Sequence, residues 1–193
     1  MTTKRLILQN TSRIYDPLGL LSPVTVKAKI FLQEIWKQKY DWDTSLPTEL
    51  QQKWITIASD LNSATQTKKS IVADDTYHLH IFVDSSSQAH GSTAYICKGN
   101  QSMLIMTKNR VAPLKQLTLP KLELMAAITG ARMSQHLRQT LESIQQKTYY
   151  WSDSQIVLHW LGSKEATNRF VRARVTEIKK ITGNATWRYC PTH

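Results

Sequence analysis

Three carboxylates occupy positions where an open mixed sheet would bring them to one point. Asp84 closes an alternating apolar run, Glu123 lies in the first turns of an amphipathic helical stretch, and Asp153 follows an aromatic run at residues 149–151. Hard divalent cations take oxygen ligands, and two of them a few ångströms apart can hold both the attacking and the leaving oxygen of a phosphodiester. The spacing therefore predicts a magnesium site and indicates a nuclease.

Each of these acids also has a structural interpretation. An aspartate after a strand commonly forms a turn or caps a helix, and a glutamate in the first turn of a helix complements the helix dipole. Ser85 and Ser152, which each precede or follow one of the acids, can hydrogen-bond to a carboxylate or satisfy the backbone of a turn. The joint placement of three acids at the ends of central elements, in a region with only six acids, favours the functional interpretation.

Positive charge is concentrated in the second part of the chain. The 193 residues carry a formal charge of +11; residues 77–193 contain 15 Lys and Arg against 6 Asp and Glu, a net +9, whereas residues 1–76 contain 10 against 8. Such a balance indicates an anionic partner, with nucleic acid as the first candidate and an anionic membrane surface as the second. We expect Arg169, Arg172 and Arg174 to contact phosphate, although a charged helix face is also typical of plain solvation.

Several other classes of protein are disfavoured. The sequence contains no stretch of about 18 apolar residues, no basic amphipathic helix suited to a membrane surface and no hydrophobic signal segment near Met1. Cys97 and Cys190 are too few for a disulfide framework, and we expect both thiols to be reduced. These features predict an intracellular protein, cytoplasmic or nuclear, that has no membrane partner.

The hydrophobic pattern changes near residue 70. Before it, residues 14–23 form a turn-rich entry in which Pro23 is expected to act as a breaker. A helix is then expected over residues 26–40, and a second one begins at Ser45 or Pro47 with an apolar stripe from Leu50 to Leu61. Residues 59–70 turn polar and are typical of a linker. We therefore expect a domain boundary near residue 70.

After the boundary, the pattern is typical of an α/β fold with a mixed sheet. Turns at Gly91 and at Gly99-Asn100 separate the first three strands, and His90 is expected to be a solvated loop residue. Ser154 is expected to cap a helix. The expected strands are 77–84, 92–98, 102–108, 149–153 and 186–190, and the expected helices are 119–141, 154–161 and 169–183.

Long blocks of sequence surround the three acids. They are VDSSSQAHGSTAYI around Asp84, KNRVAPLKQLTLPKLELMAA around Glu123 and YYWSDSQIVLHWL around Asp153. These blocks resemble the ribonuclease H domain of retroelement polyproteins, in particular the Bel/Pao class of LTR retrotransposons. The earlier stretch RIYDPLGLLSPVTVKAKIFLQEIWKQKYDWD, residues 13–43, is similar to the segment that links reverse transcriptase to ribonuclease H in those polyproteins.

The resemblance implies both a fold and an activity. The fold would be α/β: a ribonuclease H-like mixed sheet of about five strands with flanking helices over residues 71–193, preceded by a small helical segment, residues 1–70, of the thumb or connection type. The activity would be cleavage of the RNA strand of an RNA/DNA hybrid with two Mg²⁺ ions, for which Mn²⁺ can substitute. Asp84 would bridge both metals, and Glu123 and Asp153 would bind the one on the leaving-group side.

The chain departs from the family pattern at its end. In the family a fourth carboxylate follows the last strand just after the stretch WRYCPTH, and this sequence ends at His193. The domain is therefore expected to be truncated at its C-terminus. Two alternatives to an active nuclease stay open, namely a catalytically impaired remnant that binds nucleic acid and a structural connection module of a Pol polyprotein. The paired aspartates of a polymerase site are missing, so we expect no DNA synthesis.

Overall fold

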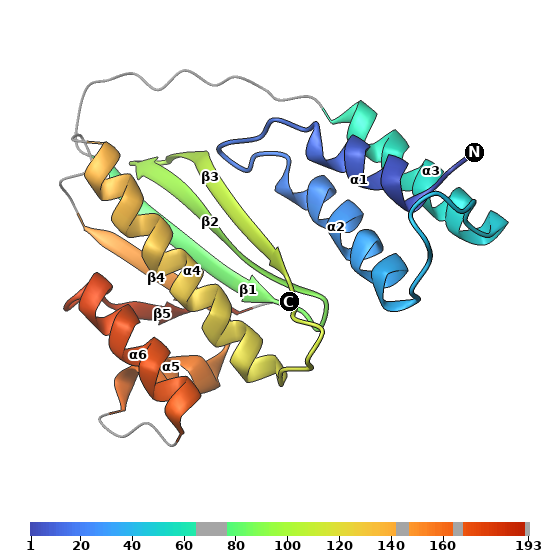
Figure 1. Ribbon diagram of the computed structural model, residues 1–193. Helices are drawn as coiled ribbons and strands as arrows, with labels where there is room; N and C mark the ends of the chain where they lie inside the picture. Colours follow the sequence, from blue (N-terminus) through green and yellow to red (C-terminus); the bar gives the residue numbers. More distant parts are fainter. Residues whose placement is uncertain (65–76, 142–146, 164–167, 192–193) are drawn as a thin grey trace. The chain divides into compact units, whose positions relative to one another are not determined.

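The computed structural model describes residues 1–64, 77–141, 147–163 and 168–191 (Figure 1). The chain divides into two compact units, Met1–Lys68 and Lys69–His193. The part of the expected linker from residue 65 onward lies outside the described residues. Among the helices that are described, none combines the length and the apolar character needed to cross a membrane.

The first unit consists of three helices around one apolar cluster. They are α1 (Lys4–Ser12), α2 (Ser22–Lys37) and α3 (Thr48–Ser63). Phe31 of α2 stacks on Trp54 of α3, with ring centroids 6.2 Å apart, and Ile7 brings α1 into the same cluster. The sequence pattern did not predict α1, although Thr3 caps it by accepting a hydrogen bond from the backbone N–H of Leu6.

Three helix boundaries in this unit differ from the prediction, and one of them is the end of α2, which lies at Lys37 rather than at residue 40. α2 begins at Ser22 rather than at Val26, because Pro23 lies in the first helical turn, where the N–H that proline lacks has no intrahelical partner to lose. α3 continues to Ser63, through residues expected to be linker. Ala58 and Leu61 pack against the apolar cluster, so burial keeps this polar stretch helical.

The second unit contains a mixed sheet of five strands in the order β3-β2-β1-β4-β5. β1 (His78–Ser85), β2 (Ala89–Lys98) and β3 (Gln101–Val111) are antiparallel neighbours, whereas β4 (Thr148–Ser152) runs parallel to β1 and β5 (Trp187–Tyr189) parallel to β4. The hairpin at Gly99-Asn100 is confirmed, since Lys98 pairs with Gln101 and Gly99 has a positive φ of 56°.

Gly91 was expected in a turn but lies inside β2, which begins at Ala89. It pairs with Asp84 of β1 and with Asn109 of β3. A Cβ atom at this position would lie 2.0 Å from the Asn109 side-chain oxygen. The glycine therefore accommodates a neighbouring side chain within the sheet rather than a chain reversal.

Three helices complete the second unit: α4 (Leu119–Thr140), α5 (Gln155–Gly162) and α6 (Arg169–Thr182). α4 lies across one face of the sheet and α6 packs against α4 (Figure 1). The predicted cap at Ser154 is confirmed, because its hydroxyl accepts from the N–H of Val157, and α6 ends before Gly183 as expected.

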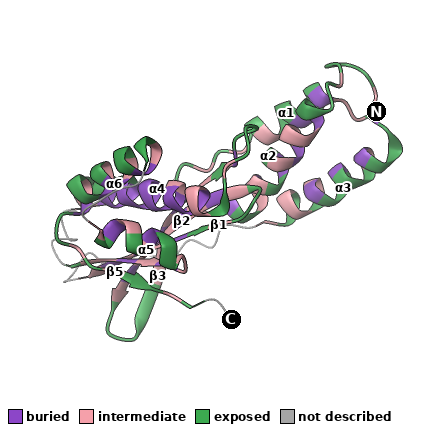
Figure 2. Ribbon diagram, turned by 90° about the horizontal axis from the view of Figure 1, so that it is seen from below, coloured by how far each residue is buried: buried purple, intermediate pink, exposed green. Residues whose placement is uncertain are grey.

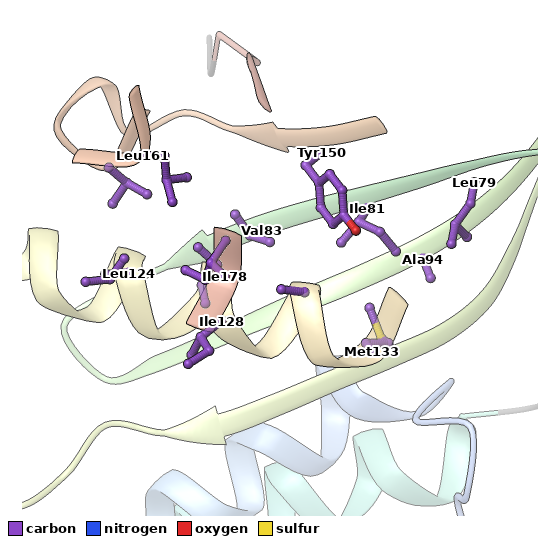
Figure 3. Close-up of a cluster of buried hydrophobic side chains, with 14 of the residues drawn as sticks. Leu79, Ile81, Val83, Ala94, Leu124, Ile128, Met133, Tyr150, Leu161 and Ile178 are labelled. Carbon is purple, nitrogen blue, oxygen red and sulfur yellow. The ribbon is translucent and has the colours of Figure 1, made fainter. Parts of the chain in front are cut away.

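The main core lies between the sheet and α4, and buried residues follow α4 along most of its length (Figure 2). Leu79, Ile81 and Val83 of β1 belong to one buried cluster with Leu124, Ile128 and Met133 of α4 (Figure 3). Close packing of this kind leaves little freedom for β1 and α4 to move relative to each other. Two of the elements that carry the predicted acids are therefore held rigidly.

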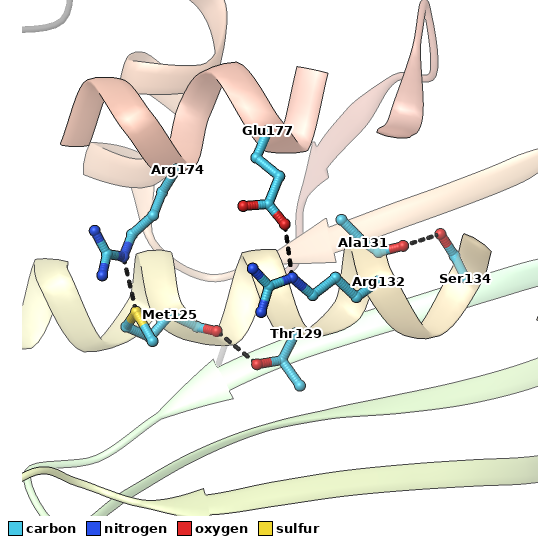
Figure 4. A network of polar contacts seen from close by, with 7 residues as sticks. All are labelled: Met125, Thr129, Ala131, Arg132, Ser134, Arg174 and Glu177. Atoms are coloured by element: carbon cyan, nitrogen blue, oxygen red, sulfur yellow. Dashed lines mark hydrogen bonds and ion pairs between the residues drawn. The ribbon is translucent and has the colours of Figure 1, made fainter. Parts of the chain in front are cut away.

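Polar contacts also join α4 to α6 (Figure 4). Arg132 of α4 forms an ion pair with Glu177 of α6, with a nitrogen–oxygen distance of 2.7 Å. Both side chains are largely exposed, so this pair contributes no more than about 1 kcal/mol. Burial of apolar residues, such as Ile178 of α6, is therefore the main interaction that holds the two helices together.

Gly130 permits the close approach of α4 to β1. A Cβ atom there would lie 2.7 Å from Cγ1 of Val83 and 2.9 Å from Cγ2 of Ile81. Overpacking typically costs about 1–3 kcal/mol, and better helix propensity returns up to about 1 kcal/mol. We expect Gly130→Ala to lower the free energy of unfolding in urea by roughly 1 kcal/mol or more.

Gly162, in the last turn of α5, provides the matched control. Among the described residues, and apart from its chain neighbours and its own helix backbone, no atom lies within 4 Å of the position that its Cβ would occupy. Gly162→Ala is therefore expected to leave the free energy of unfolding unchanged or to raise it slightly. Equal losses of stability in the two variants would contradict the packing explanation.

Candidate active site

Two neighbouring parallel strands bring Asp84 and Asp153 to the same edge of the sheet. Val83 of β1 and Ser152 of β4 are register partners, and each is followed directly by one of the two aspartates. Because the strands run in the same direction, both carboxylates lie where the strands end. Asp84 is exposed and Asp153 is half-buried.

α4 contributes the third carboxylate. The helix is anchored to the sheet close to its N-terminal end, where the hydroxyl of Ser92 in β2 donates to the carbonyl of Ala126 at 2.9 Å. Glu123, one turn earlier, is only 5% exposed. One oxygen from each of Asp84, Glu123 and Asp153 lies within 4.8 Å of the others. The structure thus brings together the three acids that were singled out in the sequence.

Proximity and burial raise the proton affinity of this cluster. Burial raises the pKa of Glu123 to about 7, with smaller contributions from the charges of Asp153 and Asp84, whereas a hydrogen bond from Ser85 opposes the shift. Burial and the charge of Asp153 also raise the pKa of Asp84. Three acids this close repel one another when ionised, so a cation among them would relieve both the repulsion and the desolvation.

Two oxygens of the cluster have no hydrogen-bond partner among the described residues. They are Oε2 of Glu123 and Oδ1 of Asp153, and both are buried. A buried oxygen without a partner is costly unless a ligand satisfies it. An all-oxygen set of carboxylates suits a hard divalent cation such as Mg²⁺. The residues present therefore fit a hard divalent cation, and the choice of Mg²⁺ is inferred from the type of ligand atom.

The two serines beside the acids differ in what they bind. The hydroxyl of Ser85 donates to Oε1 of Glu123 at 2.8 Å. The hydroxyl of Ser152 accepts from the backbone N–H of Ser154 at 3.1 Å and so shapes the turn that carries Asp153. Both interpretations of a serine next to an acid are thus realised, one at each strand end.

The three arginines of α6 lie in different surroundings. Arg169 and Arg172 are exposed. The guanidinium of Arg174 donates to Sδ of Met125 (Figure 4). It also lies 3.5 Å from the centre of the Phe170 ring and donates to the carbonyl of Phe170. Burial, which lowers the pKa of Arg174, accompanies these contacts. Arg174 therefore has a clear packing role between α6 and α4.

His90 was expected in a solvated loop, but it lies in β2 and is only 4% exposed. It pairs with Ser85 of β1, and burial together with the charge of Arg110 lowers its pKa. Its ring is therefore neutral at physiological pH. His90, Ser92, Ala94 and Ile96 occupy every second position, and this period of two was the sequence signal that His90 belongs to a half-buried strand.

A family model described as a Pao retrotransposon-like RNaseH-like domain matches residues 3–154. The matched region includes all three acids of the cluster. No curated protein sequence matches the chain. The family match confirms the resemblance seen in the sequence blocks around Asp84, Glu123 and Asp153.

Solved structures that match the chain include viral and archaeal proteins. The foamy viral protease-reverse transcriptase in complex with an RNA/DNA hybrid has a TM-score of 0.56 at 15% identity, and the match covers 97% of this chain and 27% of that one. The foamy viral protease-reverse transcriptase dRH in complex with double-stranded DNA has a TM-score of 0.53 at 16% identity, and the match covers 97% of this chain and 35% of that one. RNase H1 from Halobacterium salinarum matches over 60% of this chain and 85% of its own at 14% identity, with a TM-score of 0.43.

The chain thus spans about a third or less of the length of these foamy viral proteins. At such low identity the likeness shows a shared fold. The predicted fold class, a ribonuclease H-like mixed sheet of five strands with flanking helices, is confirmed.

Proposed function

The chain belongs to the family of Pao retrotransposon-like RNaseH-like domains, and on this basis we propose that it is a retroelement ribonuclease H that hydrolyses the RNA strand of RNA/DNA hybrids. One observation carries the proposal. Three acids from β1, α4 and the end of β4 place carboxylate oxygens within 4.8 Å of one another, and two of their oxygens are buried without a partner. A stable fold does not need such an arrangement, whereas a cation-dependent hydrolase does.

Asp84, Glu123 and Asp153 would hold two Mg²⁺ ions, or Mn²⁺ in their place. When bound, the ions would lower the pKa of the attacking water and stabilise the charge on the departing oxygen. The residues of the chain orient the ligands. Packing of β1 against α4 fixes the backbone of Asp84 relative to Glu123, and the Ser152 hydroxyl fixes the turn at Asp153.

The substrate class follows from charge and from the chemistry of the family. Residues 77–193 carry a net charge of +9, and phosphate backbones bind such a surface by releasing counterions. Recognition of a hybrid depends on backbone shape and on 2′-hydroxyls, so little preference for base sequence is expected. The helical unit Met1–Lys68 would serve as the thumb or connection segment that links this domain to the polymerase part of a Pol polyprotein.

Arg169 is a candidate phosphate ligand on the exposed side of α6. We expect Arg169→Ala to weaken hybrid binding for all sequences and to reduce the slope of log affinity against log salt by about one. Arg13→Ala removes the same charge from an exposed position in the first unit and is expected to leave the slope unchanged. Filter binding between low and moderate salt would measure the slopes.

Arg174→Ala should instead lower the melting temperature, because the guanidinium of Arg174 packs on Phe170.

Incubation of the purified chain with a hybrid labelled on either strand, in Mg²⁺ and then in Mn²⁺, tests the proposed activity. Cleavage of the RNA strand alone, abolished by EDTA, is the expected result. Retention of the hybrid without cleavage would identify a nucleic-acid-binding domain that lacks catalysis. Absence of measurable affinity at moderate salt would identify a structural connection module.

A further inference from the structure

Ser85 is the last residue of β1 and follows Asp84 directly. Because every second side chain of a strand lies on the same face, Ser85 shares the face of Leu79, Ile81 and Val83, which packs against α4. The Ser85 hydroxyl donates to Oε1 of Glu123 at 2.8 Å. One residue of β1 therefore binds a glutamate that lies 38 positions later, on a different element.

This hydrogen bond engages only one oxygen of the Glu123 carboxylate, Oε1. Its other oxygen, Oε2, is buried and has no partner among the described residues. A serine hydroxyl that merely satisfied a buried glutamate would leave no reason for this second oxygen to stay without a hydrogen bond. The pattern of one held and one free oxygen is that of a ligand kept ready for a cation by an outer partner.

We propose that Ser85 is a positioning residue of the metal site, whose hydroxyl holds Oε1 of Glu123 so that Oε2 stays available to a divalent cation. The proposal rests on the proposed metal-dependent function and extends it to a residue that is not itself a ligand. Glutamate has three rotatable side-chain bonds, and fixing them in the folded protein removes part of the ordering that the cation would otherwise have to impose. The oxygen is then oriented before the metal arrives.

Mn²⁺ affinity, measured from the electron paramagnetic resonance signal of the free ion, tests this role without any cleavage assay. Loss of an outer hydrogen-bond partner commonly weakens metal binding about 10- to 100-fold. We expect Ser85→Ala to weaken Mn²⁺ binding by about tenfold or more. Ser85→Thr, which keeps the hydroxyl, should restore the wild-type affinity.

Two further variants separate positioning from folding. Ser85→Cys keeps the size of the side chain but has only a weak donor, so it should bind Mn²⁺ as poorly as Ser85→Ala while keeping the wild-type melting temperature. Ser102→Ala removes an exposed hydroxyl from β3 and should leave Mn²⁺ affinity unchanged.

The outcomes distinguish this inference from the proposed function. Wild-type Mn²⁺ affinity in Ser85→Ala or Ser85→Cys would overturn the positioning role and leave the three-acid site intact. Failure of the wild-type chain to bind Mn²⁺ would overturn the metal site itself and the positioning role with it.

Discussion

Asp84→Asn is expected to abolish cleavage of an RNA/DNA hybrid while leaving affinity for the hybrid close to that of the wild-type chain. The amide has nearly the same shape as the carboxylate, but it carries no charge and offers only one oxygen to a cation. Asp84 is the most exposed of the three acids, so the substitution should not disturb the core. Losing several kcal/mol of charge stabilisation in the transition state corresponds to a fall in rate of roughly a thousandfold or more.

The measurement compares single-turnover cleavage with hybrid binding in the same buffer. Asp60→Asn is the matched control, because Asp60 is a half-buried residue of α3, in the other unit of the chain, and its carboxylate pairs with Lys27. It should cleave and bind like the wild-type chain. A wild-type cleavage rate in Asp84→Asn would rule out the three-acid site as the centre of catalysis.

Without divalent cations, the folded protein is expected to lose stability as the pH rises from about 4.5 to about 7. Glu123 has an ordinary pKa of 4.5 and is raised by burial to about 7 in the folded state. The folded state therefore binds this proton more tightly than the unfolded chain does, so its contribution is fully present below pH 4.5 and is lost by about pH 7. At 1.36 kcal/mol per pKa unit, the upper bound of the loss is roughly 3 kcal/mol.

Thermal unfolding of the wild-type chain and of Glu123→Gln across this interval would isolate the effect. Glutamine stays neutral at every pH, so the difference in melting temperature between the two proteins should widen in favour of the variant as the pH rises. Mg²⁺ at pH 7 should raise the melting temperature of the wild-type chain, because a ligand that binds only the folded state stabilises it, and should have little effect on the variant. Melting temperatures that change in parallel with pH in the two proteins would show that burial does not raise the pKa of Glu123. An equal effect of Mg²⁺ on both proteins would show that Glu123 is not a metal ligand.

Local patterns in the sequence determined most of the individual elements. Alternation along β1, the apolar stripe of α4 and the capping residues Ser154 and Gly183 depend on neighbours within a few positions of the chain, and the structure confirms them. The blocks around Asp84, Glu123 and Asp153 also determined the family.

The tertiary structure decided which of several local alternatives each residue adopts. Pro23 lies in the first turn of a helix and Gly91 lies within a strand, although proline and glycine suggest breaks at both positions. Residues 59–63 stay helical because Leu61, which lies among them, packs against an apolar cluster to which α1 and α2 also contribute. Periodicity shows which face of an element is apolar, but it does not show which distant segment covers that face.

The same limit applies within the candidate site. Ser85 and Ser152 are equivalent in the sequence, each next to an acid at a strand end. The packing of α4 against β1 brings a carboxylate to the Ser85 hydroxyl, whereas the Ser152 hydroxyl accepts from the backbone N–H of Ser154. Arg174 resembles its neighbouring arginines of α6 in the sequence, but in the structure its guanidinium packs on Phe170 and donates to Met125. The sequence by itself determined which residues have the chemistry for a metal site, and long-range packing decided which hydrogen bonds hold them.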